Sequence, residues 1–162
     1  MTHEKQGKPA EDFISLFETI GFPEAYRITY LAGSIAGPAY DAIKSDFGII
    51  RAEFVLLACL AHFDEMKAQD IADISRRPRN TVSRAVHRMV AEGYIERSPD
   101  AEDGRQALLR ITPAGRALQD KAAQYLKTRQ DRVLAALSAD DRKAFSDILL
   151  KLAVNATKLD DE

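Results

Sequence analysis

The stretch Ser75-Arg-Arg-Pro-Arg-Asn-Thr-Val-Ser-Arg-Ala-Val-His-Arg-Met-Val-Ala-Glu-Gly-Tyr-Ile-Glu-Arg97 decides the fold. Its apolar spacing predicts a helix that begins near Pro78 to Asn80 and ends at Gly93, a residue type that commonly caps helix C-termini. Five apolar residues fall on one face of this helix, which we expect to be buried. They are Val82, Ala85, Val86, Met89 and Val90.

The opposite face of this helix is polar and basic. The eighteen residues between Asp73 and Glu92 contain no acidic side chain, whereas an ordinary solvated helix would place acids one turn from its arginines. Arginine, asparagine and histidine on a helix can pair with base edges in the major groove, and arginines in the turn before it can hold phosphates. The pattern therefore predicts DNA contact. The candidate residues are Arg76, Arg77, Arg79, Asn80, Thr81, Ser83, Arg84, His87 and Arg88.

The charge balance fits a local interface better than a generic polyanion binder. The chain of 162 residues has a net charge of −2. The segment 76–110 holds eight arginines and five acids, a net charge of +3, which leaves −5 for the remainder. Arginine suits bidentate contacts to phosphate and guanine because its guanidinium is a planar fork.

The neighbouring segments complete a recognisable unit. The segment Arg51–Phe63 is apolar nearly all round, which predicts a central buried helix, and a short helix follows from about Lys67. Downstream, the runs Tyr94–Arg97 and Ala107–Ile111 predict two short strands joined by the polar loop 98–106. Three helices followed by a hairpin predict a mainly α fold with a small β-hairpin, a winged helix-turn-helix.

Helices outside this unit have apolar stripes but no domain of their own to cover. We expect helices over 12–20 and 23–48, with a kink near Pro38 and close backbone packing at Gly33 and Gly37. Thr112 and Ser138 predict two helix starts near the C-terminus. The last helix has the stripe Phe145, Ile148, Leu149, Leu152, Ala156 and Leu159, which predicts a homodimer interface. The expected division is 1–48 (dimerisation and effector region), 49–112 (DNA-binding region) and 113–162 (dimerisation helices).

Two motifs add a family resemblance. The stretch Ser75–Arg97 resembles the recognition helix and first wing strand of the multiple antibiotic resistance regulator (MarR) family, and Asp103-Gly-Arg105 followed by Leu108-Leu-Arg-Ile-Thr-Pro-Ala-Gly115 is similar to its wing signature. The resemblance extends from about residue 25 to the C-terminus. It implies a homodimeric transcription regulator, usually a repressor, that binds a pseudo-palindromic operator in double-stranded DNA and is released by a small ligand or an oxidant.

The resemblance also gives roles to the wing. It implies that Asp103 holds the wing and that Arg105 enters the minor groove, and Arg97 on the first wing strand joins the predicted DNA contacts. An arginine suits a narrow, electronegative minor groove, and an aspartate two residues earlier can fix a basic side chain. Turn chemistry alone is the other explanation of Asp103-Gly104.

The segment Tyr30–Tyr40 is the candidate wall of an effector pocket. Its small residues leave room, and Tyr30, Ser34 and Tyr40 offer hydrogen bonds among apolar surface. Tight helix packing at the dimer interface explains the same small residues and is the favoured interpretation.

Other functions find little support. The single cysteine, Cys59, lies in an apolar run that predicts an inert thiol, and His62 at a helix end has no second histidine nearby with which to bind a metal. No nucleophile–base pair or phosphate loop indicates an enzyme, and we expect no cofactor. No apolar run is long enough to span a membrane. A chain with a single cysteine can form no internal disulfide and fits a reducing compartment, so a cytoplasmic protein is expected. The alternative function is a winged-helix module for protein contacts, which would not need an acid-free basic face.

Overall fold

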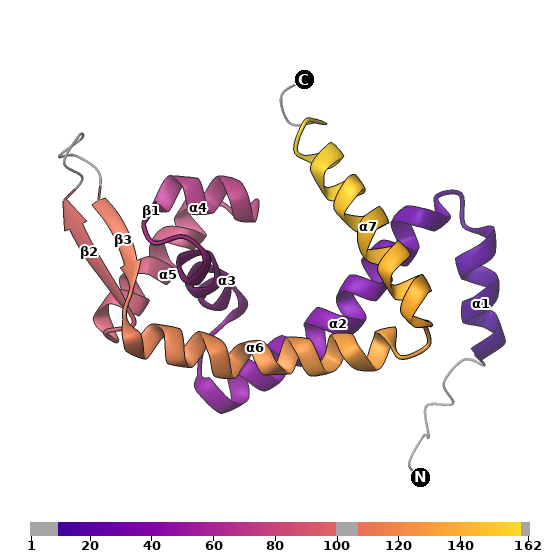
Figure 1. Cartoon of the computed structure of the whole chain (residues 1–162), viewed down its shortest axis with the longest axis horizontal. Helices are drawn as coiled ribbons and strands as arrows, with labels where there is room; N and C mark the ends of the chain where they lie inside the picture. The colour runs from indigo at the N-terminus through magenta and orange to yellow at the C-terminus, as the bar shows by residue number, and fades with distance from the viewer. Residues whose placement is uncertain (1–9, 100–106, 160–162) are drawn as a thin grey trace, which may run out of the picture.

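The computed structural model describes residues 10–99 and 107–159, and it shows a winged helix-turn-helix from which two long helices extend (Figure 1). The elements are α1 (Ala10–Thr19), α2 (Pro23–Phe47), α3 (Arg51–His62), β1 (Met66–Lys67), α4 (Ala68–Ser75), α5 (Arg79–Ala91), β2 (Ile95–Pro99), β3 (Ala107–Ile111), α6 (Pro113–Leu134) and α7 (Ala139–Ala156). This confirms the predicted fold class. Among the described residues, no helix combines the length and apolar character that crossing a bilayer requires.

The core lies in the winged unit, where α3 occupies the centre. Leu57 and Leu60 of α3 are fully buried, together with Met89 of α5 and Leu109 of β3. Ala122 of α6 packs against the same cluster. The absence of a polar face in the sequence of α3 is explained by this position, because neighbouring elements surround the helix.

The sheet has one more strand than the sequence predicted. Within the described residues, the strand order is β1-β3-β2, and both pairings are antiparallel. Met66 pairs with Leu109, and Ile95 pairs with Ile111. Strands β2 and β3 form the predicted hairpin, whereas β1 was not predicted. The periodicity of Met66–Lys67 could not reveal β1 because two residues are too few to show an alternation.

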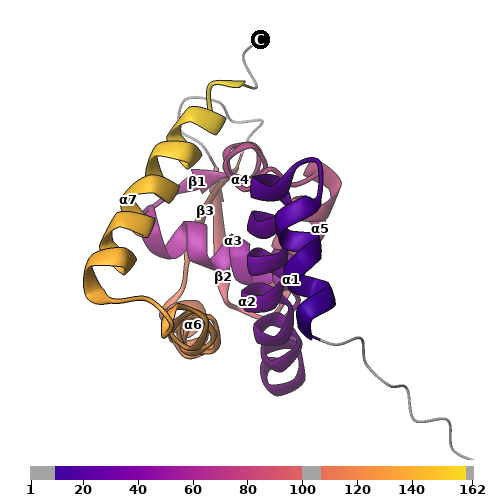
Figure 2. The same ribbon diagram turned by 90° about the vertical axis from the view of Figure 1, so that its right-hand side faces the viewer.

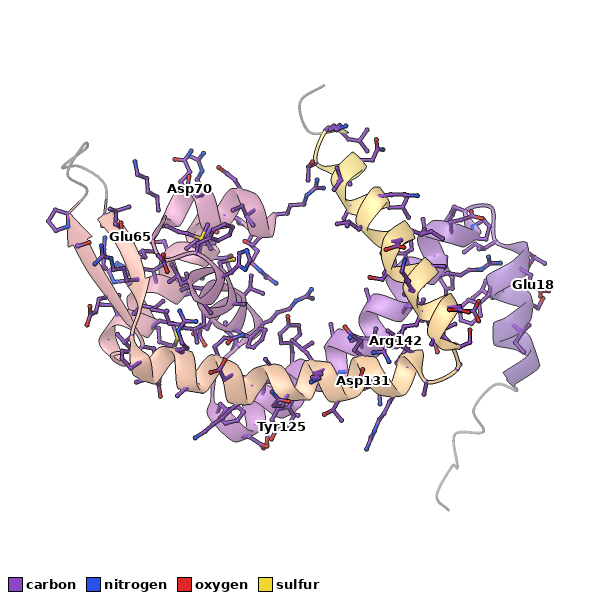
Figure 3. The ribbon with its side chains drawn as sticks, in the orientation of Figure 1. Glu18, Glu65, Asp70, Tyr125, Asp131 and Arg142 are labelled. Atoms are coloured by element: carbon purple, nitrogen blue, oxygen red, sulfur yellow. The ribbon has the colours of Figure 1, made fainter. Side chains whose placement is uncertain are left out.

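Helices α2 and α6 run beside each other and connect the winged unit to α1 and α7 (Figures 1 and 2). Arg129 Nε of α6 donates a hydrogen bond of 2.8 Å to the carbonyl oxygen of Ser34 in α2. Figure 3 shows Tyr125 on the same helix, where its hydroxyl donates to the carboxylate of Asp46. Polar contacts therefore fasten the two helices at separated points along their length.

The predicted helix starts near the C-terminus are confirmed. Thr112 Oγ1 accepts a hydrogen bond of 3.1 Å from the backbone N–H of Gly115, and Ser138 Oγ accepts one of 3.2 Å from that of Asp141. Each hydroxyl satisfies a backbone donor that the first helical turn leaves without a partner. The turn from α6 into α7 is also bridged by an ion pair of 2.5 Å between Arg142 and Asp131 (Figure 3).

Gly33 and Gly37 make no close packing contact within this chain, and packing at a dimer interface stays a prediction. A Cβ atom at either position would meet nothing within 4 Å, because both glycines lie on the exposed side of α2. The helix continues through Pro38. Close approach occurs instead at Gly115, where a Cβ atom would collide with the backbone oxygen of Tyr94.

Candidate nucleic-acid interface

A tight turn between α4 and α5 sets the start of the candidate interface. Arg76 caps α4 with φ 51°, the one positive φ at a non-glycine residue among those described. Its backbone N–H donates to the carbonyl of Asp73, and that of Arg77 donates to the carbonyl of Ala72. Pro78 then forms the N-cap of α5, whose first turn holds no acid. The dipole at this exposed end therefore favours an anion.

Helix α5 has the two faces that its spacing predicted. Val82, Ala85, Val86 and Met89 are buried, and Val90 is partly buried. Most polar residues turned away from this face are exposed, whereas Thr81 and Arg88 are half-buried. The exposed set comprises Arg79, Asn80, Ser83, Arg84 and His87.

A groove beside α5 brings the helix and the wing together. Its volume is about 390 Å³, and it lies between the start of α4, α5 and the sheet. Ser83 and His87 of α5 line it together with Arg97 of β2. Lys67 and Gln69 also line this groove, although the sequence analysis had not singled them out. Their position opposite α5 depends on β1, the strand that the sequence did not predict.

Arg76 and Arg77 of the turn and Arg79, the first residue of α5, have different environments. The Arg76 guanidinium donates a hydrogen bond of 2.7 Å to the carbonyl oxygen of Ala156 at the end of α7. Arg77 is half-buried, and its Nε atom has no hydrogen-bond partner among the described residues. Arg79 is exposed. Asp103 and Arg105, which carry the predicted wing contacts, lie outside the described residues.

Arg88 has one partner a helical turn away and two distant partners that the sequence pattern did not indicate. Its guanidinium contacts Glu53 of α3, Glu92 of its own helix and the carbonyl of Gly48. The hydrogen bond to Glu92 raises the pKa of Arg88 most, and the bond to Glu53 adds to this shift. Desolvation acts in the opposite direction. The face of α5 is free of acids locally, but acids from α3 and from the end of the helix reach this arginine.

The proposed effector residues do not converge. The ring of Tyr30 packs on Phe17 of α1, with centroids 4.9 Å apart, whereas that of Tyr40 packs on Phe54 of α3, with centroids 5.8 Å apart. Ser34 accepts the bond from Arg129 through its backbone. A cavity of about 350 Å³ lies elsewhere between α2 and α6. It is lined by Pro38, Ala39, Gln124, Tyr125, Thr128, Arg129 and Arg132.

Cys59 is less buried than its apolar sequence context predicted. The residue is half-buried in α3, and burial raises the pKa of its thiol. Among the described residues, no cluster of three or more His, Cys, Asp or Glu could hold a metal ion.

Comparison with known proteins agrees with this geometry. The family model described as MarR family matches residues 49–107, from the residue before α3's cap to the start of β3. Residues 49–107 therefore form a MarR-family domain. The chain is a DNA-binding transcriptional regulator of the winged helix-turn-helix type.

Among the relatives is the HTH-type transcriptional repressor Rv2887 of Mycobacterium tuberculosis, which is 28% identical over 128 residues, covering 77% of this chain and 90% of the relative. The transcriptional activatory protein BadR of Rhodopseudomonas palustris is 24% identical over 140 residues, covering 84% of this chain and 79% of BadR. A MarR transcriptional regulator from Methanosarcina mazei superposes with a TM-score of 0.74 at 22% identity, covering 84% of this chain and 97% of that one. A MarR-family structure from Silicibacter pomeroyi gives a TM-score of 0.67 at 26% identity, covering 79% and 88%.

Proposed function

We propose that this regulator is a homodimeric repressor that reads a pseudo-palindromic operator through α5. The observation that carries the proposal is the exposed, acid-free face of α5, which presents Asn80, Arg84 and His87. His87 also lines the groove that Arg97 of β2 borders. In this proposal Arg84 pairs with a base edge in the major groove, while Arg79 at the helix start binds phosphate. The similarity to the repressor Rv2887 supports repression over activation.

The wing supplies a second contact in this proposal. Arg105 enters the minor groove, and Asp103 orders the loop that carries it. Arg76 and Arg77 lie in the turn at the start of α5, where a phosphate would pass. Arg88 is left out of the proposed DNA contacts because Glu53, Glu92 and Gly48 already hold its guanidinium.

A dimer formed through the terminal helices would allow the regulator to read a palindromic operator. Helix α7 leaves Ile148 and Leu152 about half exposed, at 53% and 52%, and Leu149 is 38% exposed. Phe22 and Ile28 at the start of α2 are also exposed. Apolar side chains in such number on one end of a chain favour a covered interface. A twofold dimer would present two copies of α5 to successive major grooves.

A small effector would enter the cavity between α2 and α6. Pro38 and Ala39 belong to the segment that the sequence proposed as its wall, although Tyr30, Ser34 and Tyr40 do not line it. Arg129 and Arg132 suit a carboxylate, and the apolar wall suits a ring. Benzoate is therefore a suitable probe: it should weaken the DNA complex of the wild-type protein in an anisotropy titration and act less on that of Arg132→Ala.

Selection from a random duplex library tests the DNA-reading function directly. The wild-type protein should enrich a sequence with twofold symmetry, and footprinting should show protection of two half-sites about one helical turn apart. A protein-interaction module, the alternative use of this fold, would enrich no sequence. Recovery of a single unsymmetric half-site would contradict the dimeric part of the proposal.

A further inference from the structure

The guanidinium of Arg88 joins the end of α5 to the stretch 48–53, which lies 35 to 40 residues earlier in the sequence. Its Nη1 atom contacts both oxygens of Glu53 at 2.9 and 2.8 Å. Its Nη2 atom donates to the carbonyl of Gly48 at 2.9 Å, and its Nε atom donates to Glu92 at 2.8 Å. All three nitrogens of the side chain therefore have partners within the protein.

The anchor of this network is rigid. Glu53 is 3% exposed, the one buried charged residue among those described. Its Oε2 atom also accepts a hydrogen bond of 2.8 Å from the backbone N–H of Ile50, so the carboxylate is fixed to the first turn of α3. Gly48 ends α2 with φ 69°, a left-handed conformation that a glycine adopts without strain. Arg88 thus attaches α5 to the junction between α2 and α3.

The position of Arg88 within α5 makes this attachment important for the DNA-reading face. Arg84 lies one turn before Arg88, and His87 is the preceding residue. Both are exposed, and a small tilt of α5 would move both relative to a groove in DNA. Gly48 also ends the helix whose Pro38 and Ala39 wall the cavity, so the same bonds connect that helix to the reading face.

We infer that Arg88 is a positioning residue for DNA reading, which sets the orientation of α5 through Glu53 and Gly48 and does not itself contact DNA. This inference rests on the proposed function of α5. It differs from the interpretation of Arg88 as one more phosphate contact on a basic face. It also differs from a purely structural role, in which the network stabilises the fold without affecting which sequence is read.

The variant Glu53→Gln distinguishes a positioning role of Arg88 from a phosphate contact, because the two roles predict opposite changes in DNA affinity. If Arg88 bound phosphate, Glu53→Gln would release a cation toward DNA and remove a negative charge from its vicinity, so binding would strengthen. If Arg88 positions α5, Glu53→Gln loosens the anchor, and binding to the selected operator weakens despite the gain in positive charge. Asp147→Asn is the matched control, because it removes one negative charge from an exposed ion pair with Lys143 on α7.

The experiment measures anisotropy with the duplex that the wild-type protein enriches from a random library, and with a random duplex of equal length. The variants are Glu53→Gln, Arg88→Gln and Arg88→Lys, each at a temperature where circular dichroism shows it fully folded. We expect each to lose operator affinity by about tenfold or more while affinity for the random duplex changes little. Arg88→Lys keeps the charge but cannot bridge three partners, so it should not restore the affinity. Arg88→Gln should leave the slope of log K against log salt unchanged, whereas a lost phosphate contact reduces that slope by about 0.9.

Several results would overturn the inference. Stronger operator binding by Glu53→Gln would assign Arg88 to the DNA contacts, as would a shallower salt slope for Arg88→Gln. If the variants lower thermal stability but leave the ratio of operator affinity to random-duplex affinity unchanged, Arg88 has a structural role only. If Arg88→Gln does not fold, Glu53→Gln and Arg88→Lys decide by the same criteria. A wild-type protein that enriches no sequence would overturn the proposed function and this inference with it, whereas normal enrichment with unaffected variants would overturn the inference alone.

Discussion

The hydroxyl of Tyr125 in α6 donates a hydrogen bond to the carboxylate of Asp46 in the last turn of α2. The tyrosine ring also meets Phe47 edge-on, with centroids 5.8 Å apart. The bond to Asp46 raises the pKa of Tyr125 above the ordinary value of a tyrosine, and burial acts in the same direction. The folded chain therefore keeps this proton to a higher pH than the unfolded chain does.

The first prediction follows from the direction of that shift. The stabilisation by the bond is complete below the unfolded pKa of about 10 and is lost as the pH rises through the higher folded pKa. Tyr125→Phe should therefore lower the free energy of unfolding near neutral pH, and its difference from the wild type should shrink above about pH 10. Urea unfolding of both proteins across this range measures the difference. A difference that widens at high pH would contradict the assignment.

A second prediction concerns Gly115, which lies against Tyr94 at the start of α6. A Cβ atom there would collide with the Tyr94 carbonyl oxygen and lie 2.9 Å from Ile111 Cγ1. Gly115→Ala should cost about 1–3 kcal/mol or more of unfolding free energy, because backbone atoms must move to accept the methyl group. Gly21→Ala is the control, since a Cβ atom at Gly21 would meet nothing within 4 Å, and it should change stability by less than about 0.5 kcal/mol. Equal effects of the two variants would refute the packing argument.

The third prediction tests pairing through α7. Replacing Leu149 and Leu152 with Asp places charges on the exposed apolar stripe, which should yield monomers or insoluble chains in size-exclusion chromatography with light scattering. Lys151→Asp on the polar side of the same helix should remain dimeric. A soluble double variant that stays dimeric and binds the operator normally would place the interface elsewhere.

The fourth prediction addresses base reading by Arg84. Arg84→Ala should lose about 1–3 kcal/mol of binding free energy on the selected operator, while binding to a random duplex changes far less. Lys127→Ala removes an equal charge from an exposed position on α6 and should affect both duplexes little. Anisotropy titrations give both affinities. Equal losses by Arg84→Ala on the two duplexes would make Arg84 a phosphate contact.

The fifth prediction concerns the wing. Arg105→Ala removes one cation per chain, so a dimer should show a slope of log K against log salt that is shallower by up to about 2. Asp103→Ala should weaken binding with a slope nearer to that of the wild type, because the cation remains. Dimerisation and thermal stability should stay unchanged in both variants. An unchanged operator affinity and slope in Arg105→Ala would show that the hairpin does not contact DNA.

Sequence patterns predicted those features of the structure that are set by residues close together in the chain. The faces of α5 follow from a 3.6-residue period, and the starts of α6 and α7 follow from single capping hydroxyls. Glu92 lies one helical turn from Arg88, so its spacing could indicate that pair. Glu53 could not be found in this way, because it lies 35 residues earlier and meets Arg88 only after α3 and α5 pack. An isolated buried glutamate in the apolar sequence of α3 was the one signal available, since such a charge requires a partner.

The effector trio failed to converge for a reason that helix geometry could have exposed. Tyr30 and Tyr40 are ten residues apart on one helix, so they are separated by about 15 Å along its axis. The cavity instead involves α6, and contacts between α2 and α6 are not encoded in the period of either helix. The predicted segment Tyr30–Tyr40 contributes Pro38 and Ala39 to the cavity, but the three side chains named from the sequence do not line it.

The exposed apolar stripe of α7 also has a consequence for how operator occupancy would depend on the concentration of this regulator in a cell. When two chains must pair before they bind, operator occupancy at low abundance rises with the square of the chain concentration. A modest fall in synthesis would then release the operator more than proportionally. In unpaired chains, Ile148 and Leu152 would stay exposed, which favours proteolysis and aggregation. Removal of monomers in this way would make operator occupancy depend still more steeply on chain concentration.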